Sequence, residues 1–227
     1  MRASGRTEVP PPPGLAELAR RFVHVLVASL AIVVMAPLML IIAVLVRLDS
    51  PGLVIYRQAR VGLDRRRDQR SSPTNERRQL DHGGRIFTIL KFRTMCAAAE
   101  APQVWASRDD PRVTRVGRFL RATRLDELPQ LANVLKGDMN IVGPRPEQPE
   151  IFAELRSEVT SYHRRQRVLP GITGLAQVNR GSDASVDDVR RKVEFDLEYI
   201  DRRSTLEDLT IMARTMPVMI LGMRPAP

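Results

Sequence analysis

The sequence predicts a mainly helical protein with a small β element, in which an N-terminal membrane helix precedes one compact soluble domain. The first observation is a single apolar run from Phe22 to Leu48. The second is a pair of short runs rich in β-branched and aromatic residues, which are typical of strands. The third is length, because the part of the 227 residues beyond the apolar run suffices for one domain of ordinary size.

Residues 1–18 are predicted to form a disordered tail. The consecutive prolines Pro10 to Pro13 favour an extended polyproline conformation, which has no internal hydrogen bonds. The membrane helix is therefore expected at residues 19–48, after this tail.

The apolar run is long enough to cross a membrane. A straight helix over it would be about 40 Å long at ~1.5 Å per residue, against a hydrocarbon core of ~30 Å. Pro37 divides the run into legs of roughly 23 Å and 16 Å, each too short to cross alone. Arginines flank both ends, so the positive-inside rule favours neither orientation. A re-entrant helix that bends at Pro37 is favoured, a spanning helix is the alternative, and a cleaved signal is disfavoured by the length of the run.

The soluble domain begins with the two predicted strands, Gly52–Tyr56 and Ile86–Leu90, which we expect to pair in a small sheet or hairpin. Residues 64–84 between them are polar and charged, and this composition predicts a long mobile loop. The arginines of this loop either contact lipid headgroups or are simply solvated.

Three later segments have helical patterns. Pro129–Lys136 starts with a proline, which the first turn of a helix tolerates, and is followed by Gly137, a common terminator. Val186–Asp201 has the charged-apolar spacing of an amphipathic surface helix. Leu206–Met223 is apolar but contains charged residues and a proline, so a buried or interfacial helix is favoured over a second span. Gly171–Gly174 indicates a turn.

Composition limits the class of partner. The formal net charge is +10, and most of the 36 Lys and Arg residues are Arg, which suits membrane lipids with anionic headgroups and phosphate-bearing substrates. Nucleic acid is not expected, because aromatic residues make up only 4% of the chain and no zinc-ligand spacing is present. The single cysteine, Cys96, excludes an intramolecular disulfide.

The most informative motif is the adjacent acidic pair Asp126 and Glu127, which lies in a basic segment. Adjacent carboxylates repel each other unless a metal ion or nearby cations neutralise them. The cations around this pair are Arg115, Arg118, Arg121, Arg124 and, downstream, Arg145. This arrangement favours phosphoryl chemistry on an anionic substrate. For an isolated acidic pair, capping of the following helix is the alternative.

The motifs along the chain resemble those of the bacterial sugar transferases, also called monotopic phosphoglycosyl transferases, from about Val23 to Met223. The resemblance rests on the segments Tyr56–Gln58, Arg60–Gly62, Lys91–Met95, Asp110–Thr114, Val116–Arg121, Leu125–Gln130, Asn133–Met139, Val142–Pro146, Pro170–Leu175 and Gln177–Val178. Because these motifs occur in the family's order, the match is specific.

The resemblance implies a re-entrant helix and a catalytic domain, residues 49–227, on the cytoplasmic face of the bacterial inner membrane. It implies transfer of a sugar 1-phosphate from a nucleoside diphosphate sugar, with a UDP-sugar expected, to polyprenyl (undecaprenyl) phosphate. Nucleoside monophosphate is released, in the first membrane step of glycan assembly. A homo-oligomer is left open. The alternative is a non-catalytic, membrane-anchored basic scaffold that binds anionic lipid or glycan enzymes.

By resemblance, Asp126 and Glu127 are the catalytic residues. Asp126 attacks the β-phosphorus and carries the phosphosugar as a covalent intermediate. The same pair is expected to hold Mg²⁺, with Glu127 also helping to position the phosphates, and Mg²⁺ prefers such oxygen ligands.

Five further residues are predicted to bind substrate. Arg121 and Arg145 match the family's phosphate-binding positions, and an arginine can hold two phosphate oxygens at once. Lys91 and Arg93 are candidates whose alternative role is to flank a strand. Gln177 either contacts the nucleotide or sugar, or is a buried amide that stabilises a turn.

Some positions depart from the family pattern. The family often has Asp-Gly-Gly-Pro after the membrane helix, where this chain has Asp49–Gly52, and Ala36-Pro37 replaces the usual Ser-Pro. Asn140 replaces a usual Ser. Family members normally join the two strands by a short turn, so by resemblance the loop at 64–84 is an insertion. Neither Asp126 nor Glu127 is affected.

Overall fold

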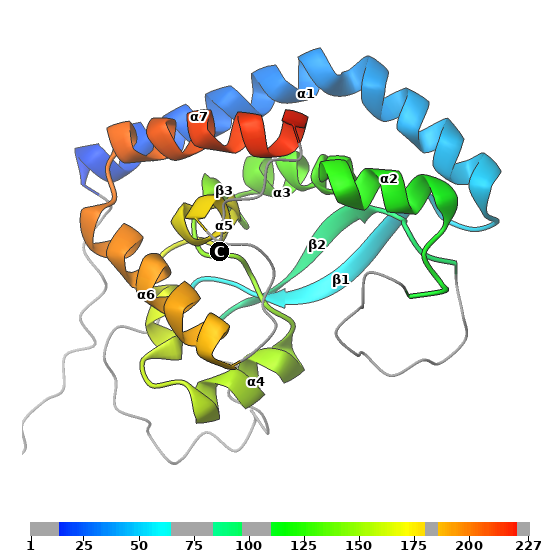
Figure 1. The fold of residues 1–227 in the computed structure, drawn as a ribbon. Helices are drawn as coiled ribbons and strands as arrows, with labels where there is room; N and C mark the ends of the chain where they lie inside the picture. Colours follow the sequence, from blue (N-terminus) through cyan, green and yellow to red (C-terminus); the bar gives the residue numbers. More distant parts are fainter. Residues whose placement is uncertain (1–13, 65–83, 97–109, 180–185, 222–227) are drawn as a thin grey trace, which may run out of the picture.

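The computed structural model describes residues 14–64, 84–96, 110–179 and 186–221 (Figure 1). The predicted mainly helical fold with a small β element is confirmed in these ranges. The elements are α1 (Leu15–Asp49), β1 (Ile55–Val61), β2 (Ile86–Phe92), α2 (Arg115–Thr123), the 3-10 turn η1 (Leu125–Glu127), α3 (Gln130–Lys136), β3 (Asn140–Val142), α4 (Pro149–Glu158), the 3-10 helix η2 (Tyr162–Arg167), β4 (Gly171–Thr173), α5 (Leu175–Asn179), α6 (Val186–Arg202) and α7 (Thr205–Leu221). Most of the predicted tail and of the inserted loop at 64–84 lies outside the described residues.

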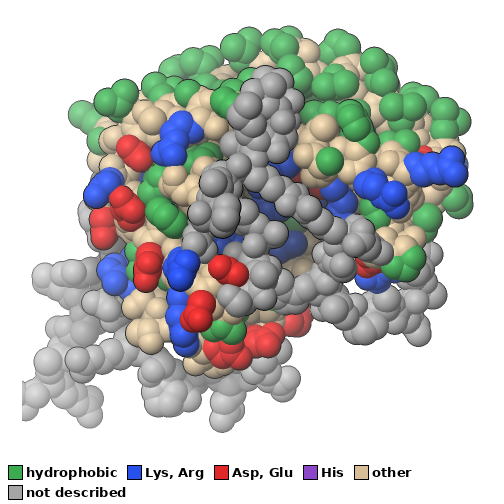
Figure 2. Space-filling model, in the orientation of Figure 1, with side chains coloured by type: hydrophobic (Ala, Val, Ile, Leu, Met, Phe, Trp, Pro, Cys, Tyr) green, Lys and Arg blue, Asp and Glu red, His purple; other side chains and the backbone are tan. Residues whose placement is uncertain are grey.

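Helix α1 is one continuous helix of 35 residues with Pro37 inside it. It is long and apolar enough to cross a membrane by length and composition. Figure 1 shows it as two legs that meet at an angle, as expected where a proline removes a backbone hydrogen bond. Figure 2 shows apolar side chains gathered along the edge of the molecule that α1 forms. Large exposed ones include Phe22, Leu30, Val33, Leu40 and Leu48.

The helix starts at Leu15, earlier than the predicted boundary at residue 19. The cause is tertiary, because the first turns of α1 are bonded to the folded domain. Arg20 is buried and donates to Asp208, and Arg21 donates to the Met139 carbonyl and to Asn140 Oδ1. The tail prediction was wrong for residues 15–18, since composition does not reveal these contacts.

Strands β1 and β2 form the predicted antiparallel hairpin, with Ile55 opposite Phe92 and Val61 opposite Ile86. The predicted first strand, Gly52–Tyr56, was placed too early. Gly52 has φ +120°, a conformation open mainly to glycine, and it turns the chain between α1 and β1. The strand therefore begins only at Ile55.

The segment Gly171–Thr173 is a strand, so the prediction of a turn was wrong there. It pairs in parallel with β3, with Asn140 opposite Gly171 and Val142 opposite Thr173. A Cβ on Gly171 would lie 2.1 Å from the Gly143 nitrogen, so glycine is needed for close approach of the two backbones.

Both legs of α1 pack on the same domain. Ala28 of the first leg joins a buried cluster with β2 and α3, which includes Ile89 and Val134. Ile42 of the second leg joins another cluster with β2 and α2. Leu128 touches both clusters, so the chain immediately after Glu127 is held between the two legs of α1.

The two C-terminal helices agree with the prediction within a few residues. Helix α6 buries Val189, Val193 and Tyr199 on one face. Helix α7 lies beside the first leg of α1 (Figure 1), with Ile211 fully buried while Leu206 is exposed. Both helices pack against β3 through a buried cluster that includes Val142, Tyr199 and Ile211.

Candidate active site

Asp126 and Glu127 lie on η1, a single turn between α2 and α3. Arg124 ends α2 in the left-handed conformation, with φ 57°, and thereby redirects the chain into this turn. Pro129 precedes α3, and no side chain caps that helix. The alternative in which the acidic pair serves as a helix cap is therefore not supported by the geometry.

Glu127 is almost fully buried between two cations. Arg145 Nη2 lies 2.6 Å from Glu127 Oε1, and its Nη1 lies 3.4 Å from Oε2. Lys91 Nζ lies 3.2 Å from Oε1. Lys91 comes from β2 and Arg145 from the loop between β3 and α4, so three separate elements bring these charges together.

The surroundings of the two carboxyl groups shift their pKa values in opposite directions. Burial and then the charge of Glu127 raise the pKa of Asp126 to about 6. Burial also disfavours the charge of Glu127, but Arg145 and Lys91 outweigh it and hold the pKa of Glu127 well below its usual range. Glu127 is thus a fixed charge at neutral pH, whereas Asp126 changes charge just below it.

Asp126 also differs from Glu127 in its contacts. Within the described ranges, no group donates a hydrogen bond to its carboxylate, although the residue is only 9% exposed. A carboxylate that is desolvated and not hydrogen-bonded keeps its lone pairs available. This arrangement suits a nucleophile better than a structural anchor.

Arg121 and Arg124 are half-buried cations on the approach to Asp126. Neither side chain makes a hydrogen bond or ion pair with any residue that the structure describes. Arg121 is one of the charges that oppose the rise of the Asp126 pKa, after Lys91 and Arg145. Their side chains are therefore available to an anionic ligand.

Arg93 is not brought to Glu127. Its guanidinium donates to the carbonyl oxygens of Val46, Ser50 and Pro51, at the C-terminal end of α1. This contact satisfies carbonyl groups that a helix end leaves unpaired and places a positive charge at the negative end of the helix. The geometry thus favours a structural role at this position, next to β2.

Gln177, on α5, is buried, and neither its side-chain oxygen nor its nitrogen has a partner among the described residues. The oxygen lies 2.7 Å from the point where a Cβ of Gly174 would be, beside the Gly143 backbone. An unsatisfied buried amide costs about 1–3 kcal/mol, so a ligand or water that bonds to it would be favoured.

Sequence reasoning missed two supports of this site. Arg60 Nη1 donates to the Pro146 carbonyl over 3.1 Å, and Arg165 Nη2 donates to the Arg145 carbonyl over 3.0 Å. Arg60 lay within a matched motif and could have been chosen, whereas nothing in the basic run around Arg165 distinguishes it from its neighbours. Asp49 accepts a hydrogen bond from the Val116 nitrogen, over 3.0 Å, and so caps α2.

The carboxylates of Asp126 and Glu127 suit Mg²⁺ only if the phosphates of a substrate supply further ligands. The described residues contain no group of three or more His, Cys, Asp or Glu side chains able to hold a metal ion. Mg²⁺ in enzymes is commonly bound by one or two carboxylates together with phosphates and water. Asp126 and Glu127 on one turn fit that arrangement, since no described residue hydrogen-bonds to the Asp126 carboxylate.

The known proteins that are similar to this chain include two named as sugar-phosphate transferases. The chain is 41% identical over 207 residues to the UDP-glucose:undecaprenyl-phosphate glucose-1-phosphate transferase of Caulobacter vibrioides, which covers 90% of this chain and 70% of that protein. It is 42% identical over 204 residues to the UDP-N-acetylgalactosamine-undecaprenyl-phosphate N-acetylgalactosaminephosphotransferase of Aeromonas hydrophila, covering 89% of this chain and 44% of that protein. It is 35% identical over 221 residues to the exopolysaccharide production protein ExoY of Sinorhizobium fredii, and the match covers 90% of this chain and 87% of that protein.

The chain thus spans less than half of the Aeromonas protein but most of ExoY. The family described as bacterial sugar transferase matches residues 15–222, which include every element from α1 to α7. With its motifs, its fold and these similarities in agreement, the chain belongs to the bacterial sugar transferase family.

Proposed function

We propose that the protein transfers a sugar 1-phosphate from a UDP-sugar to undecaprenyl phosphate and releases UMP. The observation that carries this proposal is the contrast within the acidic pair. Glu127 is neutralised by Arg145 and Lys91, while the buried Asp126 carboxylate accepts no hydrogen bond from any residue that the structure describes. The activities of the similar proteins support the substrate classes. A non-catalytic scaffold would have no need for such a pair.

In the proposed first step, an oxygen of Asp126 attacks the β-phosphorus of the UDP-sugar. The bond from that phosphorus to the bridging oxygen breaks, and UMP leaves with the electron pair. The sugar phosphate remains bonded to Asp126. In the second step, a phosphate oxygen of undecaprenyl phosphate attacks the same phosphorus and releases the Asp126 carboxylate.

A carboxylate and a diphosphate repel each other, so the site must supply positive charge. We assign this role to Arg121, Arg124 and Arg145, which surround the acidic pair. Lys91 holds Glu127 in place. Mg²⁺ held by Asp126 and Glu127 would neutralise charge on the phosphates when bound. Arg93 remains a candidate on the sequence pattern alone, and its contacts with α1 favour the structural role.

The proposal is tested by incubating the purified protein with a panel of UDP-sugars, undecaprenyl phosphate and Mg²⁺, and measuring released UMP. The panel must contain UDP-glucose and UDP-N-acetylgalactosamine, because the similar proteins differ in these sugars. Acceptor-dependent release with one sugar is the expected result. Lipid binding without any release would favour the scaffold.

The rate of the first step should depend on pH through Asp126. Since burial and Glu127 raise the pKa of Asp126 to about 6, the nucleophilic carboxylate is depleted as the pH falls through that value. Glu127→Gln removes the neighbouring negative charge, so the midpoint of the remaining activity should move to lower pH. Single-turnover UMP release without acceptor, followed across the pH range, measures both midpoints. A midpoint that moves upward in Glu127→Gln would contradict the assignment.

We further propose that α1 is re-entrant, with both of its ends on the cytoplasmic face. Two observations support this. The helix bends around Pro37, and each leg contributes to a buried cluster with the same domain. A straight spanning helix would carry one leg away from the domain and expose the apolar surface that Ala28 or Ile42 now covers.

Cysteine labelling tests this arrangement. Gly14→Cys, before α1, and Leu53→Cys, after it, lie at exposed positions. In a Cys96→Ser background, both should resist an impermeant thiol reagent in cells with a sealed inner membrane and react once the membrane is permeabilised. Labelling of Gly14→Cys alone in sealed cells would contradict the re-entrant helix. Adding Pro37→Leu, which restores the missing hydrogen bond, should shift the protein toward that spanning pattern.

A further inference from the structure

Arg165 is a buried cation that contacts three parts of the protein at once. Its Nε donates to Asp196 Oδ2 over 2.6 Å, its Nη1 to the Tyr162 hydroxyl over 2.7 Å, and its Nη2 to the Arg145 carbonyl over 3.0 Å. Asp196 belongs to α6 and Tyr162 to η2, whereas Arg145 belongs to the candidate active site. This buried ion pair therefore connects the outer helix α6 to the active-site loop.

The loop that carries Arg145 depends on such external donors. Pro144 and Pro146 flank Arg145 and have no backbone N–H groups, so the loop cannot form a regular ladder of its own. Its carbonyl groups are held from outside instead. The Pro144 oxygen accepts from the Gly171 nitrogen over 3.0 Å, and the Pro146 oxygen accepts from Arg60. The Arg145 oxygen accepts from Arg165.

The position of the Arg145 backbone determines where its guanidinium lies. That guanidinium meets Glu127 through two nitrogens, at 2.6 and 3.4 Å, and this fork-like contact requires a defined direction of approach. A shift of about 1 Å in a group that orients substrate can cost on the order of a hundredfold in rate. A donor that fixes the Arg145 carbonyl therefore bears directly on the site.

We propose that Arg165 and Asp196 are positioning residues of the reaction, which hold the Arg145 backbone so that its guanidinium meets Glu127 and the substrate phosphates. This inference rests on the proposed function. Asp196 is required because a buried guanidinium needs a countercharge, and only 5% of the Arg165 side chain and 2% of the Asp196 side chain are exposed. Asp196 thus acts through Arg165, which in turn acts through the Arg145 carbonyl.

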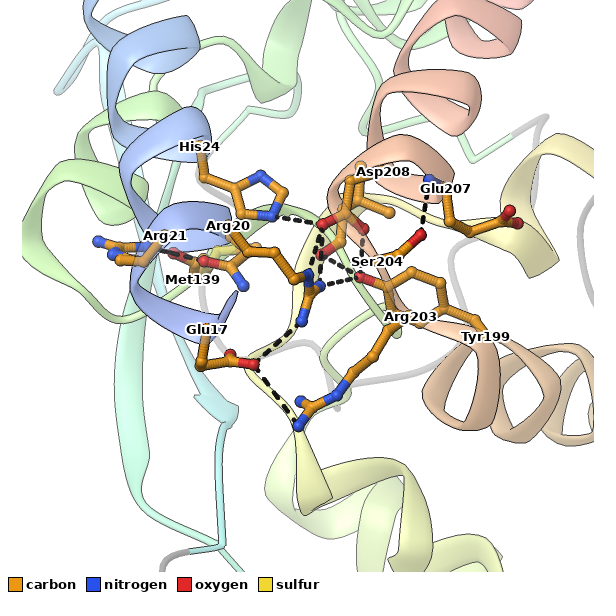
Figure 3. A network of polar contacts seen from close by, with 12 residues as sticks. Glu17, Arg20, Arg21, His24, Met139, Tyr199, Arg203, Ser204, Glu207 and Asp208 are labelled. Carbon is orange, nitrogen blue, oxygen red and sulfur yellow. Dashed lines mark hydrogen bonds and ion pairs between the residues drawn. The ribbon is translucent and has the colours of Figure 1, made fainter. Parts of the chain in front are cut away.

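The protein contains a second network that serves as a matched control (Figure 3). Arg20 pairs with Asp208, and their side chains are 6% and 1% exposed, close to the values of the first pair. Arg20 also donates to a tyrosine hydroxyl, that of Tyr199, over 3.0 Å. His24 completes the network on α1, at 3.1 Å from Asp208.

The difference between the networks is the connection to the active-site loop. The Tyr199 hydroxyl has one proton, and Asp208 Oδ1 at 2.7 Å is a closer acceptor than the Val142 carbonyl at 3.3 Å. The control network therefore holds α7 against the first leg of α1 and gives no donor to Arg145. Breaking either ion pair should lower the stability of the fold by a similar amount, because the two pairs are similarly buried. Only the Arg165–Asp196 pair contacts the Arg145 backbone.

The test compares Asp196→Asn and Arg165→Lys with Asp208→Asn in the full-length, detergent-purified protein. Thermal unfolding identifies a temperature at which all variants are folded, and single-turnover UMP release without lipid acceptor is then measured against UDP-sugar concentration. The two positioning variants should lose on the order of tenfold to a hundredfold in rate. The loss should persist at saturating UDP-sugar, because it comes from misplacement of the Arg145 guanidinium in the bound complex and not from weaker folding. Asp208→Asn should keep a rate close to that of the wild type at saturating UDP-sugar.

A double-mutant comparison makes the inference specific. In an Arg145→Lys background, Asp196→Asn should have much less effect than in the wild type, since both changes disturb the same contact, whereas Asp208→Asn should keep its full effect. If Asp196→Asn does not fold, Tyr162→Phe replaces it in the test. This substitution removes one hydrogen bond of Arg165 and should destabilise the fold less. Equal rate losses at saturating UDP-sugar and additive effects for both networks would overturn the positioning role. Failure of the proposed function would differ, because the wild type itself would release no UMP.

Discussion

Asp126→Asn is expected to abolish UMP release, with and without lipid acceptor and at every Mg²⁺ concentration. The amide has nearly the same shape as the carboxylate but cannot form the acyl phosphate bond at a useful rate. Since no described residue hydrogen-bonds to the Asp126 carboxylate, the substitution removes no hydrogen bond that the structure describes. Activity is measured as UMP released per folded protein, with thermal unfolding as the check on folding.

Glu127→Gln is the matched comparison on the adjacent residue. It keeps the nucleophile but leaves Arg145 and Lys91 without their countercharge, and it weakens the proposed Mg²⁺ site. Some activity should therefore return as Mg²⁺ is raised. Substantial turnover by Asp126→Asn, or identical behaviour of the two variants, would rule out the division of roles between the two carboxyl groups.

Arg145→Ala is expected to lower kcat/KM for the UDP-sugar by on the order of a hundredfold to a thousandfold, the range found when one charge-stabilising donor is removed from an active site. Among the described residues, the buried Glu127 would keep only Lys91 as a hydrogen-bonding partner, and the phosphates would lose a two-pronged contact. Arg145→Lys should recover part of the rate, because it restores the charge but not the fork.

The control for this change is Arg190→Ala on the exposed face of α6. Arg190 pairs with Asp187 at 2.8 Å, but both side chains are more than half exposed, so the pair contributes little. Its loss should leave kcat/KM unchanged. An Arg145→Ala enzyme as active as Arg190→Ala would remove Arg145 from the proposed mechanism.

Local pattern predicted the elements whose signals are local. The hairpin, α3 with its terminating Gly137, and the amphipathic α6 all follow from residue spacing and turn chemistry. The parallel pair of β3 and β4 did not, because three-residue strands have no periodicity. The glycines that permit the close approach of these strands are also turn signals. Likewise, the start of α1 depends on contacts with distant Asp208.

The residues of the candidate site also fall into two groups, those that sequence motifs predicted and those whose positions depend on distant contacts. Motif spacing selected the acidic pair, Lys91 and Arg145, and the structure brings all four charges together. Arg93, selected by the same reasoning as Lys91, instead lies against the end of α1, because its neighbours in space are set by how the membrane helix packs on β2. Arg165 is 20 residues from the carbonyl it supports, and no sequence signal connects them.

The central claim is that the sugar phosphate is bonded to Asp126 between the two steps. Intact-mass measurement of the wild-type protein, incubated with its UDP-sugar and Mg²⁺ but without undecaprenyl phosphate, tests it directly. The protein should gain the mass of one sugar phosphate, peptide mapping should locate it on Asp126, and addition of the lipid acceptor should remove it. An adduct on another residue, or full acceptor-dependent turnover with no adduct on the acceptor-free enzyme, would contradict the covalent mechanism.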